Sequence, residues 1–402
     1  MAGRTDPESD PREPAAPGFA LPPDAPEPLG NGPGGYGRRV LRERTPTLIT
    51  EVRDRHPYGP GQRRALDALR EEIASGAMRP LGEGAPDRAR WDRWGAAYFG
   101  RPWADVPFLW WESYFYRRLL EAVEFFTPGP WFWVDPFEYW KTAELRDATV
   151  AVPAHRRPAA DERQALLPAS LWGNQADLGF LFGAAGGPAA SGGLVADDGA
   201  LVWSALDAGG PDHVAVVADN AGRELLADLL LIDHLLRTGL AATVTLHLKP
   251  HPYYVSDATT ADLVACLRRL AAADGEAAAV ERRLSEAIGT GRLRLRAHAF
   301  FCAPWSYHHM PADLAEEFGG RTLTIMKGDL NYRRLVGDLA WPPTTPFAEV
   351  TAYFPGPVAA LRTLKSDVVT GVDAATLSSL DASGGDWRTS GTHGLIQARV
   401  ST

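Results

Sequence analysis

Three polar clusters follow short apolar runs in the second half of the chain, and their side chains are suited to binding a metal ion or a phosphate. Asp219 and Asn220 follow the run HVAVVA, Asp257 follows ATVTLHL within KPHPYYVSD, and KGDLNYRRL follows RTLTIM. Such apolar runs, alternating with helical patterns, are typical of the strands of an α/β sheet. Because ligands bind beyond the carboxyl ends of the strands in an open α/β sheet, we expect the three clusters to meet in one cleft.

The first two clusters would form an oxygen-rich ligand set. Asp219 and Asp257 supply carboxylates and Asn220 supplies an amide oxygen, which suits Mg²⁺ or Mn²⁺ better than zinc. Gly222 would allow a close backbone approach, and the start of the following helix would favour an anion. Asp219 or Asn220, taken alone, could instead cap that helix, since both residue types are preferred caps. The pairing with Asp257 favours the metal site.

The segment KGDLNYRRL places cations, an amide and a carboxylate around a glycine. Cations and an amide suit a phosphate ester, and the carboxylate can bind hydroxyl groups. The segment is not a Walker loop, because no GxxxxGK[ST] pattern occurs in the chain. We therefore predict four substrate-binding residues here: Lys327, Asp329, Asn331 and Arg333.

Two further pairs of charged residues can be interpreted either as structural or as functional. Glu224 and Asp228 lie one helical turn apart, which is typical of a solvated helix face. Glu224 falls in the first turn of its helix and could point into the cleft. Arg362 and Lys365 follow another predicted strand, in LRTLKSD, and their spacing alone indicates a solvated surface pair.

Composition excludes several other classes of function. The 402-residue chain has a formal net charge of −9, which argues against broad binding to nucleic acids or anionic membranes. Cys266 and Cys302 form no CxxC pair, so a reducing compartment is expected. HExxH and GxSxG patterns are absent, and the histidines are expected to be ordinary polar or packed residues. No segment is typical of a membrane span or a signal peptide, so we expect a cytoplasmic protein.

The period of the apolar residues predicts the domain organisation and an α/β fold class. Leu66, Leu69 and Ile73 lie at helical spacing, and eight of the thirteen tryptophans fall between Trp91 and Trp140. This region is predicted to be a helical domain with aromatic packing. The later alternation of strands and helices predicts a largely parallel sheet covered by helices. The expected organisation is a disordered tail (1–40), a helical N-terminal domain (41–165), an α/β metal- and phosphate-binding domain (166–375) and a loose C-terminal tail (376–402).

Three charged residues of the aromatic-rich region stand apart from this packing. Arg117, Asp135 and Lys141 lie among many aromatic residues and are expected to be partly buried. A buried charge needs a partner or a ligand.

Taken together, the motifs resemble the metal-dependent damage-control phosphatases of the acidic-residue-methyltransferase-like subfamily. The resemblance rests on DNAGRELLADL, LKPHPYYVSD, KGDLNYRRL and the RTLK of Arg362 to Lys365. RERTPTLIT, WESYFYRRLL, FWVDPFEYWK and SLWGNQADL match the N-terminal half of the family. The similarity extends from about Arg42 to Asp367, and only the two tails depart from the family pattern.

The resemblance implies a helical N-terminal domain on a Rossmann-like α/β/α domain. It implies a divalent metal ion (Mn, Mg, Co or Ni) held by Asp219, Asn220 and Asp257. It implies that Lys365 is a catalytic residue of the site and not the surface residue that its spacing alone indicated. The implied activity is hydrolysis of small sugar phosphates, such as fructose 1-phosphate and fructose 6-phosphate, in metabolite damage control. The implied substrate-binding residues are Glu224, Asp329, Asn331, Arg333 and Lys365.

Two alternatives remain open. One is an S-adenosylmethionine-dependent methyltransferase acting on protein glutamate, an activity attributed to the subfamily, although no glycine-rich methyl-donor loop is apparent. The other is a non-catalytic sugar-phosphate-binding protein, which the set of Asp219, Asn220 and Asp257 argues against because binding alone needs no metal. The sequence does not decide whether Asp219 attacks phosphorus directly, and it predicts no oligomeric state.

Overall fold

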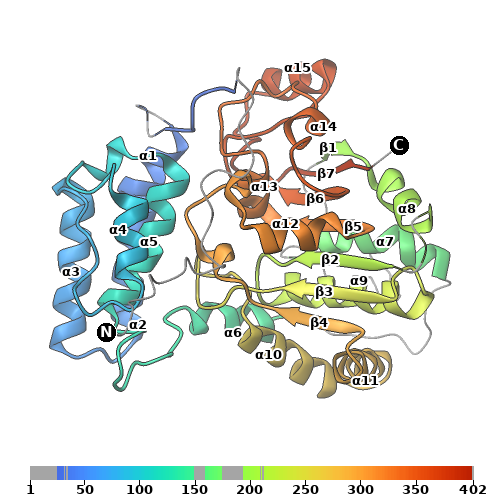
Figure 1. Ribbon diagram of the computed structural model, residues 1–402, viewed down its shortest axis with the longest axis horizontal. Helices are drawn as coiled ribbons and strands as arrows, with labels where there is room; N and C mark the ends of the chain where they lie inside the picture. The colour runs from blue at the N-terminus through green and yellow to red at the C-terminus, as the bar shows by residue number, and fades with distance from the viewer. Residues whose placement is uncertain are drawn as a thin grey trace, which may run out of the picture.

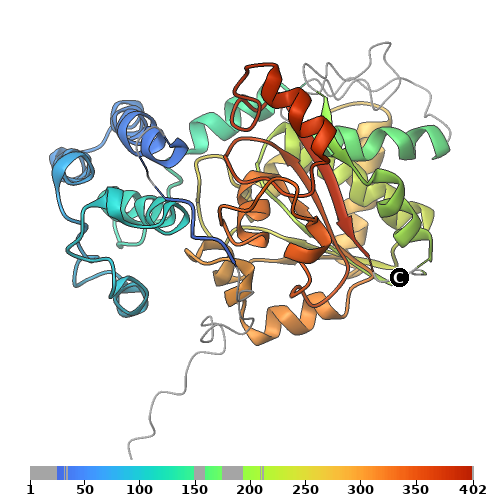
Figure 2. The same cartoon turned by 90° about the horizontal axis from the view of Figure 1, so that it is seen from above.

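A helical lobe and an α/β lobe lie side by side in the protein (Figures 1 and 2). The computed structural model describes residues 25–30, 32, 35–148, 159–173, 193–208, 210 and 212–400. None of the helices within these residues is both long enough and apolar enough to cross a membrane.

The helical lobe, residues 35–137, is built around an aromatic core. Its longest buried helix, α5, has the sequence FLWWESYFYRRLLEA and is covered on almost every side. The predicted helix with Leu66, Leu69 and Ile73 is confirmed, and all three side chains are buried. The elements of the lobe are α1 (Tyr36–Arg39), the π-helical turn η1 (Val40–Arg44), α2 (Thr45–Arg55), α3 (Pro60–Ser75), α4 (Arg88–Gly95), η2 (Trp103–Asp105) and α5 (Phe108–Ala122).

The buried charges expected among these aromatic residues have protein partners. Arg117 is 3% exposed, and its Nε donates to Asp87 Oδ2 at 2.9 Å. Lys141 lies on α6 (Glu138–Arg146), which joins the lobes, and its Nζ donates to Asp135 at 2.9 Å and to Asp262 at 3.0 Å. These charges therefore belong to the structural framework.

The α/β lobe contains a largely parallel sheet, as the sequence predicted. Its strand order is β1-β7-β6-β5-β2-β3-β4. All neighbouring strands run parallel except β6 and β7. The strands within the described residues are β1 (Leu194–Asp197), β2 (His213–Val217), β3 (Thr243–His247), β4 (Leu293–Arg296), β5 (Leu323–Lys327), β6 (Val358–Thr363) and β7 (Gly394–Arg399).

Helices cover both faces of the sheet, and each face has its own core. Val214 and Val216 of β2 face one core, whereas Ala215 and Val217 face the other, as the alternation of a strand requires. The first core contains α7 (Ala159–Leu171), α8 (Gly199–Ala208), α9 (Arg223–Thr238), α10 (Thr260–Ala271) and α11 (Glu276–Gly289). The second contains η4 (Ala299–Cys302), η5 (Tyr307–His309), α12 (Ala312–Gly319), α13 (Gly328–Leu335) and α14 (Phe347–Val350). The expected domain boundary at 165/166 falls inside α7, which packs with the α/β lobe.

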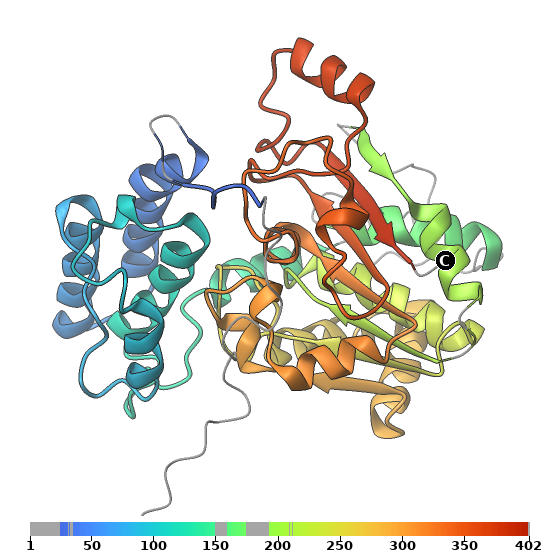
Figure 3. The same cartoon turned by 45° about the horizontal axis from the view of Figure 1, so that its top comes forward.

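The prediction of a loose C-terminal tail is wrong. Strand β7 lies inside the sheet, paired antiparallel with β6 and parallel with β1. Its side chains are buried because they point alternately into the cores on the two faces of the sheet, and Gly394 leaves room for the Trp172 ring. The strand was not predicted because the tail is rich in Ser, Gly and Thr. Helix α15 (Ala374–Ala382), by contrast, buries no residue and projects from the end of the lobe (Figure 3).

The prediction of a disordered N-terminal tail is wrong for the part that the structure describes. The Leu29 amide donates to the Asp338 carbonyl at 2.9 Å, and the Leu29 carbonyl accepts from the Phe108 amide at 3.2 Å. This segment thus bridges the two lobes, and the chain becomes helical at Tyr36. The remainder of the prediction, residues 1–24, 31, 33 and 34, lies outside the described residues.

Candidate active site

The polar clusters meet at the ends of β2 and β5, where the order of the strands in the sheet reverses. Strand β2 leads through α9 to β3 on one side, whereas β5 leads through α13 to β6 on the other. The two helices lie on opposite faces of the sheet, so a crevice opens between the ends of β2 and β5. Asp219 follows β2 and Asp329 lies at the start of α13. This topology brings together residues more than a hundred positions apart.

Glycines permit the close approach of the chain at this crevice. Gly328 has φ +79°, and a Cβ at this position would lie 1.9 Å from Asp219 Oδ2. No other residue would fit without moving the carboxylate. Gly222 also has positive φ, but the atom nearest to its absent Cβ belongs to Glu144 of α6. The expected close approach at Gly222 is therefore made to a helix.

The loop after β3 carries Asp257 to the end of β2. The Ala221 amide donates to the Ser256 carbonyl at 2.7 Å, and the Ala258 amide donates to the Asp219 carbonyl at 2.8 Å. Asn220 and Asp257 form an isolated antiparallel bridge. A capping box then begins α10, which anchors the far end of the loop.

The same loop contains a strained turn. Tyr254 and Val255 have φ of +46° and +59°, a conformation that is costly for residues with bulky or branched side chains. Tyr254 stacks on Tyr116 of the helical lobe, with ring centroids 4.6 Å apart. Packing against the helical lobe thus holds the turn that precedes Asp257.

The three predicted metal ligands are buried and adjacent. Asp219, Asn220 and Asp257 are 6%, 8% and 2% exposed. Asn220 Nδ2 donates to Asp219 Oδ2 at 2.7 Å and to Glu224 Oε2 at 2.9 Å. The amide oxygen of Asn220 accepts from the Ser256 hydroxyl. The capping alternative is not realised, because the N-cap of α9 is Gly222 and not Asp219 or Asn220.

This cluster has an excess of negative charge. Burial raises the pKa of Asp219 well above its usual value, and the charges of Glu224 and Asp257 raise it further. Burial also raises the pKa of Asp257 to about 6, although Lys249, whose Nζ lies 3.3 Å from Asp257 Oδ2, acts in the opposite direction. Facing buried carboxylates favour either protonation or a nearby cation.

The donor chemistry fits a divalent cation. The set contains two carboxylates and one amide oxygen, which are ligands that Mg²⁺ and Mn²⁺ accept. Among the described residues, no three His, Cys, Asp or Glu side chains gather in an arrangement that could hold a metal ion. The set of Asp219, Asn220 and Asp257 has only two such residues, so an ion there would also need oxygen from water or a phosphate.

Arg362 organises the opposite side of the cleft, although its spacing indicated a solvated residue. It is fully buried, and its Nε donates to Asp329 Oδ1 at 2.8 Å. The same oxygen accepts from the Lys365 amide at 3.2 Å. Burial raises the pKa of Asp329, but the Arg362 and Arg333 charges outweigh this and the net pKa is lowered. The surface prediction for Arg362 is wrong because Arg362 belongs to β6, a buried strand between β5 and β7, and its guanidinium packs on the Tyr332 ring.

Lys365 lines the cleft, unlike its neighbour Arg362. Its side chain is half-buried, and within the described part of the chain its Nζ makes no hydrogen bond or ion pair. The charge of Lys365 lies beside an acidic cluster and makes no such contact there with the described residues, so it is suited to binding an anionic ligand.

The structure divides the predicted site residues into two groups. Lys327 is buried against Glu224 and Asp228, at 3.3 and 3.1 Å. Asn331 Nδ2 donates to the backbone carbonyls of Lys327 and Ala218, at 2.8 and 3.1 Å. Glu224, Lys327 and Asn331 thus support the cleft from behind and do not line it. The predicted residues that line the cleft, which has a volume of about 100 Å³, are Asp219, Asn220, Asp257, Asp329, Arg333 and Lys365.

The helical lobe supplies cleft residues that the sequence analysis did not select. Tyr36, Arg44 and Glu112 line the cleft together with Tyr254 and Ser256 of the loop after β3. A signal for two of them was present, because Arg44 lies in RERTPTLIT and Glu112 is a carboxylate within the apolar pattern of WESYFYRRLL.

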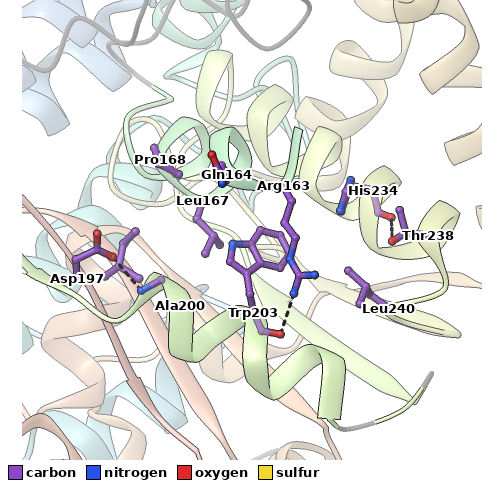
Figure 4. A pocket seen from close by; sticks show the side chains of 12 residues that line it. Arg163, Gln164, Leu167, Pro168, Asp197, Ala200, Trp203, His234, Thr238 and Leu240 are labelled. Carbon is purple, nitrogen blue, oxygen red and sulfur yellow. Dashed lines mark hydrogen bonds between the residues drawn. The ribbon is translucent and has the colours of Figure 1, made fainter. Parts of the chain in front are cut away.

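A larger cavity, of about 780 Å³, lies on one face of the sheet and is lined by residues of α7, α8 and α9 (Figure 4). Thr238 and Leu240 line it just before β3 begins. The arginine that lines it is engaged with protein, since Arg163 Nη2 donates to the Trp203 carbonyl and to Asp207. This cavity shares no lining residue with the cleft.

A family model described as the damage-control phosphatase ARMT1-like domain matches residues 40–380. The chain belongs to this family. Damage-control phosphatase ARMT1 of Danio rerio is 29% identical over 429 residues, covering 90% of this chain and 94% of the relative. The Homo sapiens protein of the same name is 28% identical over 441 residues, covering 92% and 97%.

Among solved structures, a DUF89 family protein of Pyrococcus horikoshii matches with a TM-score of 0.45 and 14% identity, covering 85% of this chain and 94% of that chain. Membership in the ARMT1-like family supports a phosphatase of metabolite damage control that acts on a small molecule.

Proposed function

We propose that this member of the ARMT1-like family hydrolyses small sugar phosphates, of the fructose 1-phosphate and fructose 6-phosphate type, with a divalent metal ion. One observation carries the proposal. A buried pair of carboxylates, Asp219 and Asp257, faces the cations Lys365 and Arg333 across a cleft at the switch point of the sheet.

The residues of the cleft suit the separate parts of such a substrate. Asp219, Asn220 and Asp257 would hold the metal ion, which when bound supplies a Lewis acid for the phosphoryl oxygens and a more acidic water. Lys365 and Arg333 would bind phosphoryl oxygens and stabilise the charge that develops during transfer. Asp329, whose Oδ1 is held by Arg362, would present Oδ2 to a sugar hydroxyl.

A phosphate-release assay tests the proposal. The chelator-treated protein would be supplied with Mn²⁺, Mg²⁺, Co²⁺ or Ni²⁺ and a panel of sugar monophosphates. We expect release of inorganic phosphate with at least one ion and none with EDTA. Release that persists in the chelated protein contradicts the metal requirement, and no release with any ion from a folded protein contradicts the activity.

The same material tests the alternatives. Saturable binding of S-adenosylmethionine with methyl transfer to glutamate would support the methyltransferase. Binding of sugar phosphate without turnover under every metal condition would support the non-catalytic binding protein.

A further inference from the structure

Glu112 is a buried carboxylate that the helical lobe contributes to the cleft of the other lobe. It lies on α5 and is 4% exposed. Its Oε2 accepts a hydrogen bond from Arg333 Nη1 at 2.9 Å. The neighbouring α5 side chains pack in the aromatic core, so the position of this carboxylate is defined by the helical lobe.

Arg333 is held from two directions. Asp338 accepts from its Nε at 2.7 Å and from its Nη2 at 3.0 Å. The Phe108 ring of α5 lies against the guanidinium, with its centroid 4.1 Å from Cζ. These contacts fix the plane of the guanidinium, and together with the bond to Glu112 they use three of its five N–H groups, so one remains on each terminal nitrogen.

Glu112 is not needed to neutralise Arg333. Asp338 already provides a bidentate carboxylate for it, and a second buried carboxylate is costly to desolvate. That cost is visible in Glu112, since burial raises its pKa while the Arg333 and Arg44 charges lower it. An apolar side chain at this position would fill the space without that cost, so a role in the cleft explains the carboxylate better than stability does.

We propose that Glu112 is a positioning residue that turns the remaining N–H groups of Arg333 toward a phosphate ester bound in the cleft. This role rests on the proposed function. It makes substrate binding depend on contact between the two lobes, because Glu112 and Phe108 belong to one lobe and Arg333 to the other.

Glu112→Gln tests this role, with Glu72→Gln as the matched control. Glu72 is also a buried carboxylate of the helical lobe, 5% exposed, and it pairs with Arg79 at 2.7 Å and Arg118 at 3.1 Å. It does not line the cleft. For Glu112→Gln we expect KM for a sugar monophosphate to rise about tenfold and kcat to fall by a smaller factor, because a charge-assisted hydrogen bond that orients Arg333 is weakened. Glu72→Gln should leave both constants unchanged.

Conservative variants separate positioning from folding. Glu112→Asp keeps the charge and should raise KM less than Glu112→Gln does, with thermal melts run on every variant. If Glu112→Gln and Glu72→Gln have the same kinetic constants, the positioning role is wrong. If Glu112→Gln does not fold, the KM of Glu112→Asp decides, and a value equal to that of wild type overturns the proposal.

Calorimetric titration distinguishes a failure of this proposal from a failure of the proposed function. If the wild type releases no phosphate from any ester, the enzymatic proposal fails. Weaker binding of fructose 6-phosphate by Glu112→Gln than by wild type would still support the positioning role. Equal binding by the two proteins, or no binding by wild type, overturns it.

Discussion

Two carboxylate sites in this protein, one in each lobe, have opposite electrostatic character. In the helical lobe, Asp87 binds Arg117 through two nitrogens, and the Arg117 contacts outweigh the effect of burial so that the pKa of Asp87 is lowered. In the cleft, Asp219 and Asp257 face each other, and burial raises the pKa of both. Asp87, whose charge is met by Arg117, is a structural element, whereas the crowded carboxylates of the cleft have too few cations and are suited to a partner from outside.

The largest expected effect is a loss of activity on substitution of a carboxylate in the cleft. Asp257→Ala should lower kcat/KM for a sugar monophosphate by more than about 1,000-fold, since a ligand of the catalytic metal is lost. The variant should remain folded, with a lower melting temperature than wild type, because the buried Lys249 loses the carboxylate 3.3 Å from its Nζ. Phosphate release and calorimetry measure both quantities. An unchanged rate would show that Asp257 is not part of the catalytic site.

The corresponding change in the helical lobe should affect stability and leave activity alone. Asp87→Ala leaves Arg117 buried without its carboxylate, which should lower the free energy of unfolding by roughly 3 kcal/mol. Urea denaturation measures this loss, and kcat/KM at a temperature where the variant is folded should stay within about twofold of wild type. A large loss of activity in the folded variant would show that the two sites are coupled.

Lys365 should behave as a cleft residue with a smaller effect than Asp257. Lys365→Ala removes a charge-assisted contact to the phosphoryl group, worth roughly 2–4 kcal/mol in the transition state. The expected loss in kcat/KM is about 30- to 1,000-fold, without a change in the melt. Arg388→Ala, a charge change at a half-exposed residue outside the cleft, serves as control. If folded Lys365→Ala has a kcat/KM within about twofold of that of wild type, Lys365 does not act on the substrate and the surface interpretation holds.

The smallest expected effect is the pH dependence of the Asp87 pair. Because the folded state holds the Asp87 proton less tightly than the unfolded state, the pair stabilises the protein fully above the unfolded pKa of about 3.9. The contribution is lost as the pH falls through the lower folded pKa. Asp87→Asn should therefore lose less stability than wild type between pH 5 and pH 2 in denaturant titrations. Parallel curves for the two proteins would contradict the assignment.

Much of the fold could be predicted because the local patterns agree with the tertiary structure. The apolar runs after His213, Thr243 and Leu323 are strands, and the helical spacing around Leu66 is a helix. Strand β7 was missed because its sequence, GLIQAR, is short and follows a Ser- and Gly-rich stretch. Its burial comes from β1 and β6, whose positions the local sequence does not contain.

The types of residue at the strand ends, together with the family resemblance, were sufficient to select Asp219, Asn220, Asp257 and Lys365. Which side chains face the cleft was decided only by the tertiary structure. Lys327 and Asn331 belong to the same segment as Asp329 and Arg333, yet Lys327 at the end of β5 pairs with Asp228 inside the protein, and Asn331 of α13 binds a backbone carbonyl. Glu112 comes from the other lobe, and its contact with Arg333 joins residues 221 positions apart. Residue chemistry is local, but the direction of a side chain and the meeting of two lobes depend on packing across the whole chain.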